Sequence, residues 1–375
     1  MNKAAKTALR VVVCVLTALF LAAAFVLSGS AVINYGPSKT ARDLFVVSML
    51  ETSAMKFLAT WYFSPEEIDS ICSENAVEAE SGFSDPSLVT FDTNAPPVET
   101  ETDVYFPGDT GVYSHVTETD VITGEVTETT AAETKYEPPE YKNASLYLSE
   151  GGIDIYDVTG GTFKGKMMVV HDPSRVTIGT RGDNLNDGKP GKTLKKMARE
   201  ANATGAVNGG GFYDPNGSGN GGEPTGIVIK DGRIVYGSAS KEYEVIGFTK
   251  NNVFVVGKMT GQKALDIGIR DAITFGPVLV MNGKPSKVSG SGSGINPRTA
   301  IGQRADGSVL LLAVDGRMAT SIGATYADLI DVMTNFGAIN AANLDGGTST
   351  HMYYKGELIT NGMFERELPD CVIVK

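Results

Sequence analysis

The stretch Arg298-Thr-Ala-Ile-Gly-Gln-Arg-Ala-Asp-Gly-Ser-Val-Leu-Leu-Leu-Ala-Val-Asp-Gly-Arg317 contains two apolar runs that are separated by Asp306-Gly307. An Asp-Gly pair is typical of a tight hairpin turn, because glycine adopts a positive φ without steric cost. Similar pairs separate other apolar runs of the C-terminal half: Asp231-Gly232, Asn282-Gly283 and Lys355-Gly356. The pattern predicts strands that pair in antiparallel fashion.

Two segments of the same region have helical rather than strand periodicity. Residues 193–201 and 325–336 are expected to form helices, and Gly337 is placed to end the second one. A strand over residues 339–344 should follow and lead into Asp345-Gly-Gly347. Because helices and strands do not alternate regularly, we predict an α+β fold with a mixed, largely antiparallel sheet and a few helices.

The N-terminus has the pattern of a membrane anchor. Lys3, Lys6 and Arg10 precede an apolar run over residues 11–27, which extends to residue 33 through small side chains. This length can span a bilayer, and the basic flank favours a cytoplasmic N-terminus. Residues 1–35 are therefore predicted to be a transmembrane signal anchor, and the alternative is a cleaved signal peptide. With either reading, the rest of the chain is expected to be exported.

Residues 36–72 are predicted to form a helical juxtamembrane stalk. Apolar side chains recur with helical spacing over residues 40–62, and Ser64-Pro-Glu-Glu67 resembles the start of a second helix. The neighbouring aromatic side chains Trp61, Tyr62 and Phe63 suit a membrane interface. The stalk could act as a spacer, or it could mediate self-association or bind a partner.

Residues 73–140 are predicted to be a disordered linker. From residue 74 to residue 140 the chain holds 16 acidic residues and one basic residue, and Thr and Pro are frequent. Such a composition buries too little apolar surface to offset the conformational entropy of the chain. Since the whole chain carries a formal charge of −12, the acidity resides in this linker, and it argues against a nucleic-acid partner. Residues 141–375 are left as one folded domain.

The cysteines and histidines do not form a zinc or disulfide pattern. The three cysteines are far apart in the sequence, and a disulfide between Cys72 and Cys371 is left as an alternative. The chain has three histidines. Asp214, Asp315 and Asp345 offer oxygen atoms that suit Ca²⁺ or Mg²⁺, but no spacing rule demands a metal site.

Three segments combine strand ends, glycines and reactive polar side chains. They are Asn208-Gly-Gly-Gly-Phe-Tyr-Asp214 with Gly222-Glu-Pro-Thr-Gly226, Asn296-Pro-Arg-Thr-Ala-Ile-Gly302 with Val314-Asp-Gly-Arg317, and Asn343-Leu-Asp-Gly-Gly-Thr-Ser-Thr-His351. Polar side chains at strand ends gather into sites, and neighbouring glycines let the backbone approach a ligand closely.

In this order and spacing the segments resemble the phosphodiester glycosidase family over roughly the last 200 residues. The matching positions are 208–212, 224–226, Gly276-Pro277 with Leu279, 298–302, 314–317, 343–347 and Glu365-Arg366. Thr348 and Ser349 stand where the family usually has Gly and Ser, and Asn296 stands where it often has His. These departures bear on substrate identity more than on fold.

The resemblance implies hydrolysis of a sugar that is linked through its anomeric oxygen to a phosphodiester. Such a reaction needs a phosphate clamp, for which Arg298 is the first candidate and Arg317 the second. It also needs a carboxylate near the anomeric carbon, for which Asp345 comes before Asp315. The remaining candidates are substrate-binding residues: Asn208, Gly210, Glu223, Asn343, Gly346, Thr348, His351 and Arg366.

Each candidate also has a structural explanation. Asp315 could form a turn, Asp345 could cap the loop that follows it, and Arg298 could belong to a structural ion pair. His351 could carry protons or be a buried spectator. At the level of function, we expect a hydrolase that acts on a cell-envelope glycan, of exopolysaccharide or teichoic-acid type. The alternative is a non-catalytic carbohydrate-binding module that organises envelope polymers.

Overall fold

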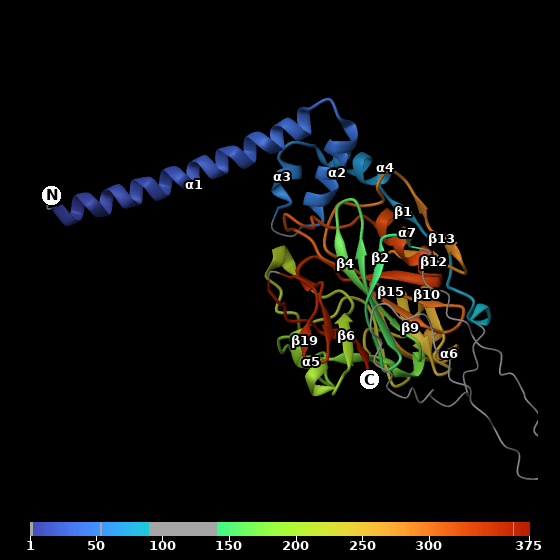
Figure 1. Cartoon of the computed structure of the whole chain (residues 1–375). Helices are drawn as coiled ribbons and strands as arrows, with labels where there is room; N and C mark the ends of the chain where they lie inside the picture. The colour runs from blue at the N-terminus through green and yellow to red at the C-terminus, as the bar shows by residue number, and fades with distance from the viewer. Residues whose placement is uncertain (1–2, 53–54, 90–140, 363) are drawn as a thin grey trace, which may run out of the picture.

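The structure, a computed structural model, describes residues 3–52, 55–89, 141–362 and 364–375. These residues form an α+β domain with a helical N-terminal region on one side (Figure 1). Every strand pairing that the structure describes is antiparallel. The predicted fold class is therefore confirmed.

The largest sheet has eight strands in the order β13-β12-β17-β15-β16-β4-β3-β2. Its members are β2 (Ala144–Glu150), β3 (Ile153–Thr159), β4 (Lys164–Val170), β12 (Val278–Met281), β13 (Lys284–Pro285), β15 (Arg298–Arg304), β16 (Val309–Val314) and β17 (Ala338–Leu344). β15 and β16 are the two apolar runs on either side of Asp306-Gly307, and they pair as predicted.

Two five-stranded sheets complete the domain. One has the order β10-β9-β11-β7-β8, from β7 (Val228–Lys230), β8 (Arg233–Tyr236), β9 (Glu242–Thr249), β10 (Phe254–Thr260) and β11 (Ile269–Thr274). The other has the order β19-β18-β6-β20-β5, from β5 (Val176–Thr180), β6 (Gly205–Asn208), β18 (Met352–Tyr354), β19 (Glu357–Leu358) and β20 (Asp370–Val374). Side chains of all three sheets, among them Met168, Ile246 and Val372, form one apolar core.

Short helices cover the outer faces of the sheets. α7 (Tyr326–Asn335) begins with a capping box between Thr325 and Asp328 and packs Val332 against the eight-stranded sheet. α5 (Leu194–Glu200) covers the sheet that contains β6, and α6 (Gly261–Asp266) covers the remaining sheet. Both helices predicted in this domain are thus present, each within one residue of its expected ends.

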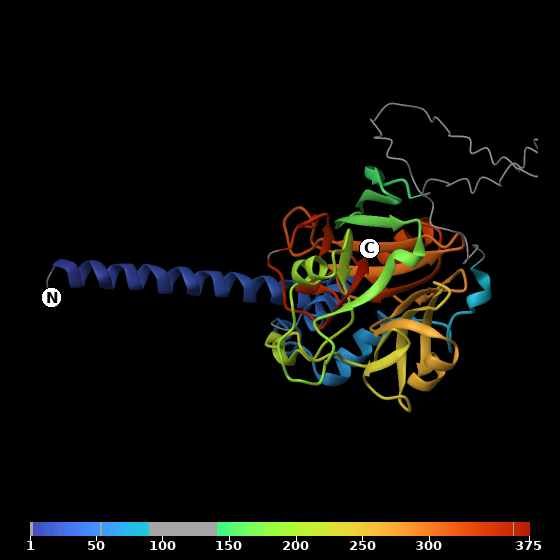
Figure 2. The same ribbon diagram turned by 90° about the horizontal axis from the view of Figure 1, so that it is seen from below.

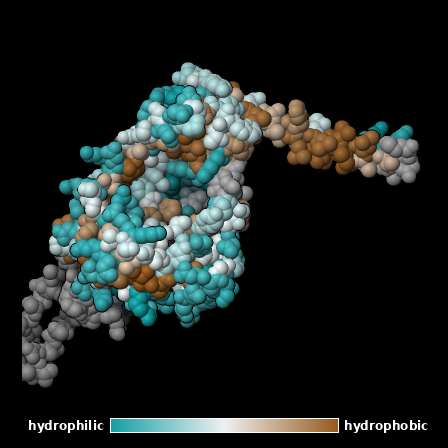
Figure 3. All heavy atoms as spheres, turned by 180° about the vertical axis from the view of Figure 1, so that it is seen from behind, coloured by the Kyte–Doolittle hydropathy of each residue, from teal (hydrophilic) through white to brown (hydrophobic). Residues whose placement is uncertain are grey.

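Helix α1 (Lys3–Tyr35) projects away from the domain in both ribbon views (Figures 1 and 2). Its segment from Ala5 to Tyr35 contains an 18-residue window with a mean hydropathy of 2.8 and no buried residue, so it is long and apolar enough to cross a membrane. Figure 3 shows its apolar surface standing apart from the polar surface of the domain. The topology across a membrane stays a prediction.

The segment after α1 is less regular than predicted. The described part of residues 40–62 does not form one helix: α2 (Lys39–Leu50) ends at Leu50 with Glu51 as its C-cap, and the next helical turn is α3 (Phe57–Thr60). Local side-chain bonds favour this end, because Ser48 Oγ and Thr52 Oγ1 donate to the carbonyl oxygens four residues earlier. The second predicted helix is confirmed as α4 (Pro65–Glu74), whose capping box joins Ser64 and Glu67.

Residues 36–52 and 55–89 lie against the domain and do not extend from it as a free spacer. Ile295 N donates to Ser48 Oγ at 2.8 Å, and β1 (Val77–Glu78) pairs with β14 (Lys287–Val288). On the other side, Tyr62 Oη donates to the Leu27 carbonyl oxygen of α1 at 3.1 Å. α2, α3 and α4 therefore form a cap that joins the end of α1 to the domain. The disordered linker was predicted over residues 73–140, but residues 73–89 are ordered, since α4 extends to Glu74 and β1 pairs with β14. Residues 90–140 of the predicted linker lie outside the described residues. All three cysteines are free.

Candidate active site

A cavity of about 490 Å³ opens between the cap and the sheets, and Figure 3 shows the hollow from outside. This volume suits a small ligand such as a monosaccharide with its phosphate. Six of the residues predicted from sequence line it: Arg298, Arg317, Asp345, Gly346, Thr348 and Arg366. Residues that the sequence did not indicate as site residues also line it, among them Glu51, Thr52, Phe275 and Tyr326.

Strand register explains why residues distant in sequence meet here. β15 pairs with β16 on one side and with β17 on the other, both in antiparallel fashion. Arg298, the first residue of β15, lies opposite Val314, the last residue of β16, and Thr299 lies opposite Leu344, the last of β17. The Val-Asp-Gly-Arg and Leu-Asp-Gly-Gly turns therefore leave the sheet at the edge where β15 begins.

Asn208, at the end of β6, connects the Asp345 turn to β15 and to the segment that contains His351. It is fully buried, and its Nδ2 donates to the Asp345 carbonyl oxygen at 2.6 Å. Its Oδ1 accepts from Thr299 Oγ1 at 2.7 Å and from His351 N at 3.3 Å. Asn208 therefore fixes the Asp345 turn and does not itself line the cavity.

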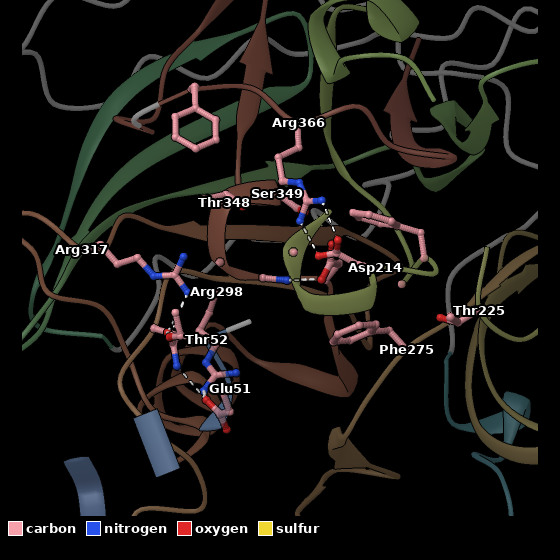
Figure 4. Close-up of a pocket in the computed structure, with 18 of the residues that line it drawn as sticks. Glu51, Thr52, Asp214, Thr225, Phe275, Arg298, Arg317, Thr348, Ser349 and Arg366 are labelled. Atoms are coloured by element: carbon pink, nitrogen blue, oxygen red, sulfur yellow. Dashed lines mark hydrogen bonds and ion pairs between the residues drawn. The ribbon is translucent and has the colours of Figure 1, made fainter. Parts of the chain in front are cut away.

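Arg298 is held from several sides. Its Nη2 donates to Glu51 Oε2 at 2.6 Å and to the Gly294 carbonyl oxygen at 2.7 Å, and its guanidinium lies 4.1 Å from the centre of the Tyr326 ring. Asn296 Nδ2 donates to the same Glu51 oxygen at 2.8 Å. The arginine that sequence favoured as the phosphate clamp is thus ion-paired with the cap (Figure 4).

Arg317 reaches the cavity from a strained turn. Its backbone has a φ of 59°, a left-handed conformation that is uncommon for residues other than glycine. Its Nη2 donates to Asn296 Oδ1 at 3.1 Å and weakly to Thr52 Oγ1 at 3.4 Å. Among the described residues no carboxylate lies within 4.0 Å of it. Partial burial and the neighbouring Arg298 lower the pKa of Arg317, so an anion beside it would be stabilised.

Asp345 stands in the wall of the cavity, where Oδ1 accepts from Gly346 N at 2.9 Å. Desolvation raises the pKa of the Asp345 carboxyl to about 6, against the opposing effect of hydrogen bonds from Ser349 and Gly346. A carboxyl with such a pKa is a functional-site candidate, because it changes protonation near physiological pH.

Arg366 and Asp214 form the opposite side of the cavity. The guanidinium binds both carboxylate oxygens of Asp214, at 2.7 and 3.0 Å, and lies 4.8 Å from the centre of the Phe212 ring (Figure 4). This bidentate ion pair lowers the pKa of Asp214 and orders the loops that carry both residues.

Asp315 and His351 lie apart from this cavity. Both oxygens of Asp315 accept from Asn361, from its backbone N and from its Nδ2, each at 2.9 Å. Asp315 lines a neighbouring small pocket instead. His351 is buried, and its Nε2 is 3.2 Å from the Phe364 carbonyl oxygen. Both residues thus hold the chain segment that brings Phe364 to the cavity.

The other three predicted residues also have local partners. Glu223 lines a separate pocket of about 230 Å³ and accepts from Tyr236 Oη. Asn343 Nδ2 donates to the Gly276 carbonyl oxygen, and Gly210 N donates to Asp370 Oδ1. The three carboxylates considered for a metal do not converge, and no group of three metal-binding side chains occurs within the described residues.

The chain is similar to known proteins over its C-terminal part. The family model described as "Phosphodiester glycosidase" matches residues 201–375. The SPbeta prophage-derived uncharacterized protein YomE of Bacillus subtilis (strain 168) is 32% identical over 185 residues, covering 45% of this chain and 27% of that protein. The N-acetylglucosamine-1-phosphodiester alpha-N-acetylglucosaminidase of Bos taurus is 26% identical over 184 residues, covering 44% of this chain and 34% of that protein. The chain thus spans about a third or less of the length of these relatives.

A solved structure has a similar fold. The zebrafish N-acetylglucosamine-1-phosphodiester alpha-N-acetylglucosaminidase catalytic domain, in a form described as auto-inhibited by pro-peptide, superposes with a TM-score of 0.50 at 21% identity. The match covers 62% of this chain and 86% of that one. The chain thus matches the phosphodiester glycosidase family model over residues 201–375 and shares the fold of this catalytic domain.

Proposed function

We propose that the protein is an extracytoplasmic hydrolase that releases a sugar from a phosphodiester-linked glycan of the cell envelope. The observation that carries the proposal is the presence of Arg317 and Asp345 in one cavity. Arg317 is a cation without a carboxylate partner among the described residues, and Asp345 is a carboxylate with a raised pKa. A sugar-1-phosphodiester needs one group of each kind.

Arg317 is proposed to anchor the phosphate. A phosphodiester carries one negative charge, and a guanidinium can bind two of its oxygens through a planar pair of N–H groups. Arg298 contributes less directly, because its Nη2 is engaged by Glu51 and by the backbone. Thr348 and Gly346 line the same wall and offer hydroxyl and backbone groups to the ligand.

Asp345 is proposed to act at the anomeric carbon in its ionised form, either as nucleophile or as the base that activates water. The anomeric C–O bond breaks, and its electron pair leaves with the phosphate oxygen. Water supplies OH to the sugar, and its second proton is released, since the phosphomonoester is a weak base. A general acid is therefore less important than in an ordinary glycosidase.

The location and the substrate class are proposals that the N-terminal region supports. α1 has the length and hydropathy of a membrane span, and its basic N-terminal flank favours a cytoplasmic N-terminus. The catalytic domain would then face the envelope, where glycans of exopolysaccharide or teichoic-acid type carry phosphodiesters.

The test uses the full chain in detergent with a panel of sugar-1-phosphodiesters, with and without EDTA, and follows free sugar by mass spectrometry. Sugar release that is lost in Asp345→Asn and Arg317→Ala would support the proposal. Loss of release with EDTA would indicate a divalent cation. If the panel binds but is never cleaved, the domain is better described as a carbohydrate-binding module.

A further inference from the structure

One wall of the cavity comes from residues outside the range 201–375 that the family model matches. Glu51 follows α2 in the cap, and its Oε2 accepts from Arg298 Nη2 at 2.6 Å and from Asn296 Nδ2 at 2.8 Å. Its Oε1 accepts from Gly294 N at a longer 3.4 Å. The carboxylate thus receives hydrogen bonds from three groups of the domain, and Figure 4 shows it against Arg298. Arg317 and Tyr326 line the same cavity.

The cap holds Glu51 in this place through contacts of its own. Ser48 Oγ accepts from Ile295 N, and Asn75 Oδ1 accepts from Ser291 N at 3.2 Å. Val46, Leu58 and Ile71 are buried in or beside the cap's own apolar core. The cavity still measures about 490 Å³ with Glu51 present. Glu51 is therefore a part of the wall and leaves room for a ligand.

The consequence is electrostatic. Three arginines line the cavity, and two of them have carboxylate partners, Arg298 with Glu51 and Arg366 with Asp214. Arg317 is the arginine among the described cavity residues without such a partner. With Glu51 ionised, Arg317 is thus the guanidinium that lacks an ion-pair partner, and the Asp345 carboxylate lines the same cavity. Without the Glu51 charge, the neighbouring Arg298 would also lack an ion-pair partner, and the cavity would carry one more positive charge.

We propose that Glu51 is a specificity-determining positioning residue, which makes the site prefer a singly charged phosphodiester to a doubly charged phosphomonoester. The inference rests on the proposed function and extends it. A phosphodiester has one negative charge, whereas a phosphomonoester carries nearly two at neutral pH. Hydrolysis converts the first into the second, so Glu51 would repel the product and favour its release. Glu51 acts through Arg298, which it neutralises and orients.

Direct binding of two small anions to the full chain in detergent tests the proposal. Dimethyl phosphate serves as the singly charged probe and methyl phosphate as the doubly charged probe, both at pH 8 and followed by ligand-observed NMR. Glu51→Gln keeps the shape of the side chain and removes its charge. Removal of one nearby charge should tighten methyl phosphate about tenfold more than dimethyl phosphate.

Glu74→Gln is the matched control. Glu74 belongs to the same cap, pairs with Lys39 and does not line the cavity, so this variant should keep the selectivity of the parent. Glu51→Asp, which retains the charge, should also keep it. If Glu51→Gln lowers the melting temperature, the Glu51→Asp variant still tests whether the negative charge at this position sets the selectivity.

Three results would overturn the proposal. The parent could bind both probes equally, Glu51→Gln could leave the ratio unchanged, or it could tighten both probes alike and raise turnover of diesters. The last result would mean that Glu51 occupies the substrate's place. Because binding is measured without turnover, preserved selectivity in a protein that cleaves no substrate would refute the proposed hydrolase and leave this inference standing.

Discussion

The side chain of Asn208 holds the backbone of Asp345: Nδ2 donates to the Asp345 carbonyl oxygen at 2.6 Å, from a residue that is fully buried. In return, Asp345 N donates to the Gly209 carbonyl oxygen at 3.1 Å. Two loops that are more than 130 residues apart in sequence are thereby fixed to each other. The position of the Asp345 carboxylate depends on this connection.

Asn208→Ala should therefore affect both stability and activity. It removes three hydrogen bonds and leaves buried partners such as Thr299 Oγ1 without theirs, at a cost of about 2–4 kcal/mol in the free energy of unfolding. Denaturant unfolding measures this cost, and sugar release measures the activity of the folded fraction. Asn335→Ala, on the exposed end of α7, is the control. An Asn208→Ala protein of parental stability would contradict this account.

Substitution of Arg317 can separate the phosphate binding of its side chain from the strain in its backbone. Arg317→Gly removes the phosphate anchor and also relieves the left-handed backbone conformation, which costs about 1 kcal/mol or more for a residue with a side chain. We expect kcat/KM for phosphodiesters to fall roughly 10–100-fold, about the loss of one charge-assisted bond, while the melting temperature stays the same or rises. Arg317→Lys should recover part of the binding. A melting temperature well below that of the parent would show that Arg317 is instead a structural residue.

The pH dependence of turnover should follow Asp345. Desolvation raises the pKa of this carboxyl to about 6, and the proposed mechanism uses the ionised form. kcat/KM should therefore rise with pH through about 6, and Asp345→Asn should lower kcat at least about 100-fold. Initial rates between pH 4.5 and 8 test the profile. Activity that falls over this range would assign Asp345 the role of a proton donor.

Much of the fold could be predicted from local sequence signals. Three predicted turns place both central residues at positive φ, as hairpins of this kind require: Asp231-Gly232, Asn282-Gly283 and Lys355-Gly356. The alternation of such turns with apolar runs was enough to predict antiparallel strands. Two helices of the domain, α5 and α7, could be located because Thr193 and Thr325 cap their first turns.

The site was less predictable, because part of it depends on contacts between distant segments. Glu51 was read as part of one continuous helix, and nothing in its neighbourhood signals a partner 247 positions away. Asp315 and Asp345 both follow a strand and precede a glycine. Their surroundings separate them, since Asn361 occupies both oxygens of Asp315 while Asp345 lines the cavity. Strand register brings such residues together, and sequence periodicity does not specify which strands become neighbours.

Asp370 gives a prediction about stability. It is fully buried at the start of β20, and its Oδ1 accepts from Gly210 N at 2.6 Å, while Oδ2 has no hydrogen-bond partner among the described residues. Desolvation is the main cause that raises the pKa of this carboxyl to about 7, and the nearby Asp345 contributes. The folded protein thus favours the neutral carboxyl, whereas the unfolded chain ionises near pH 4.

Because the folded pKa lies above the unfolded one, the folded state binds more protons between about pH 4 and 7, and stability falls as pH rises through this window. Asp370→Asn keeps the acceptor for Gly210 N and cannot ionise. At pH 8 it should be more stable than the parent by on the order of 2–4 kcal/mol, and at pH 4 the two should be nearly equal. Asp306→Asn, in an exposed turn, serves as the control. Chemical denaturation at both pH values measures the difference in stability. An Asp370→Asn protein that is equally destabilised at pH 4 and pH 8 would contradict the prediction. It would show that packing requires the carboxyl group itself, whatever its protonation.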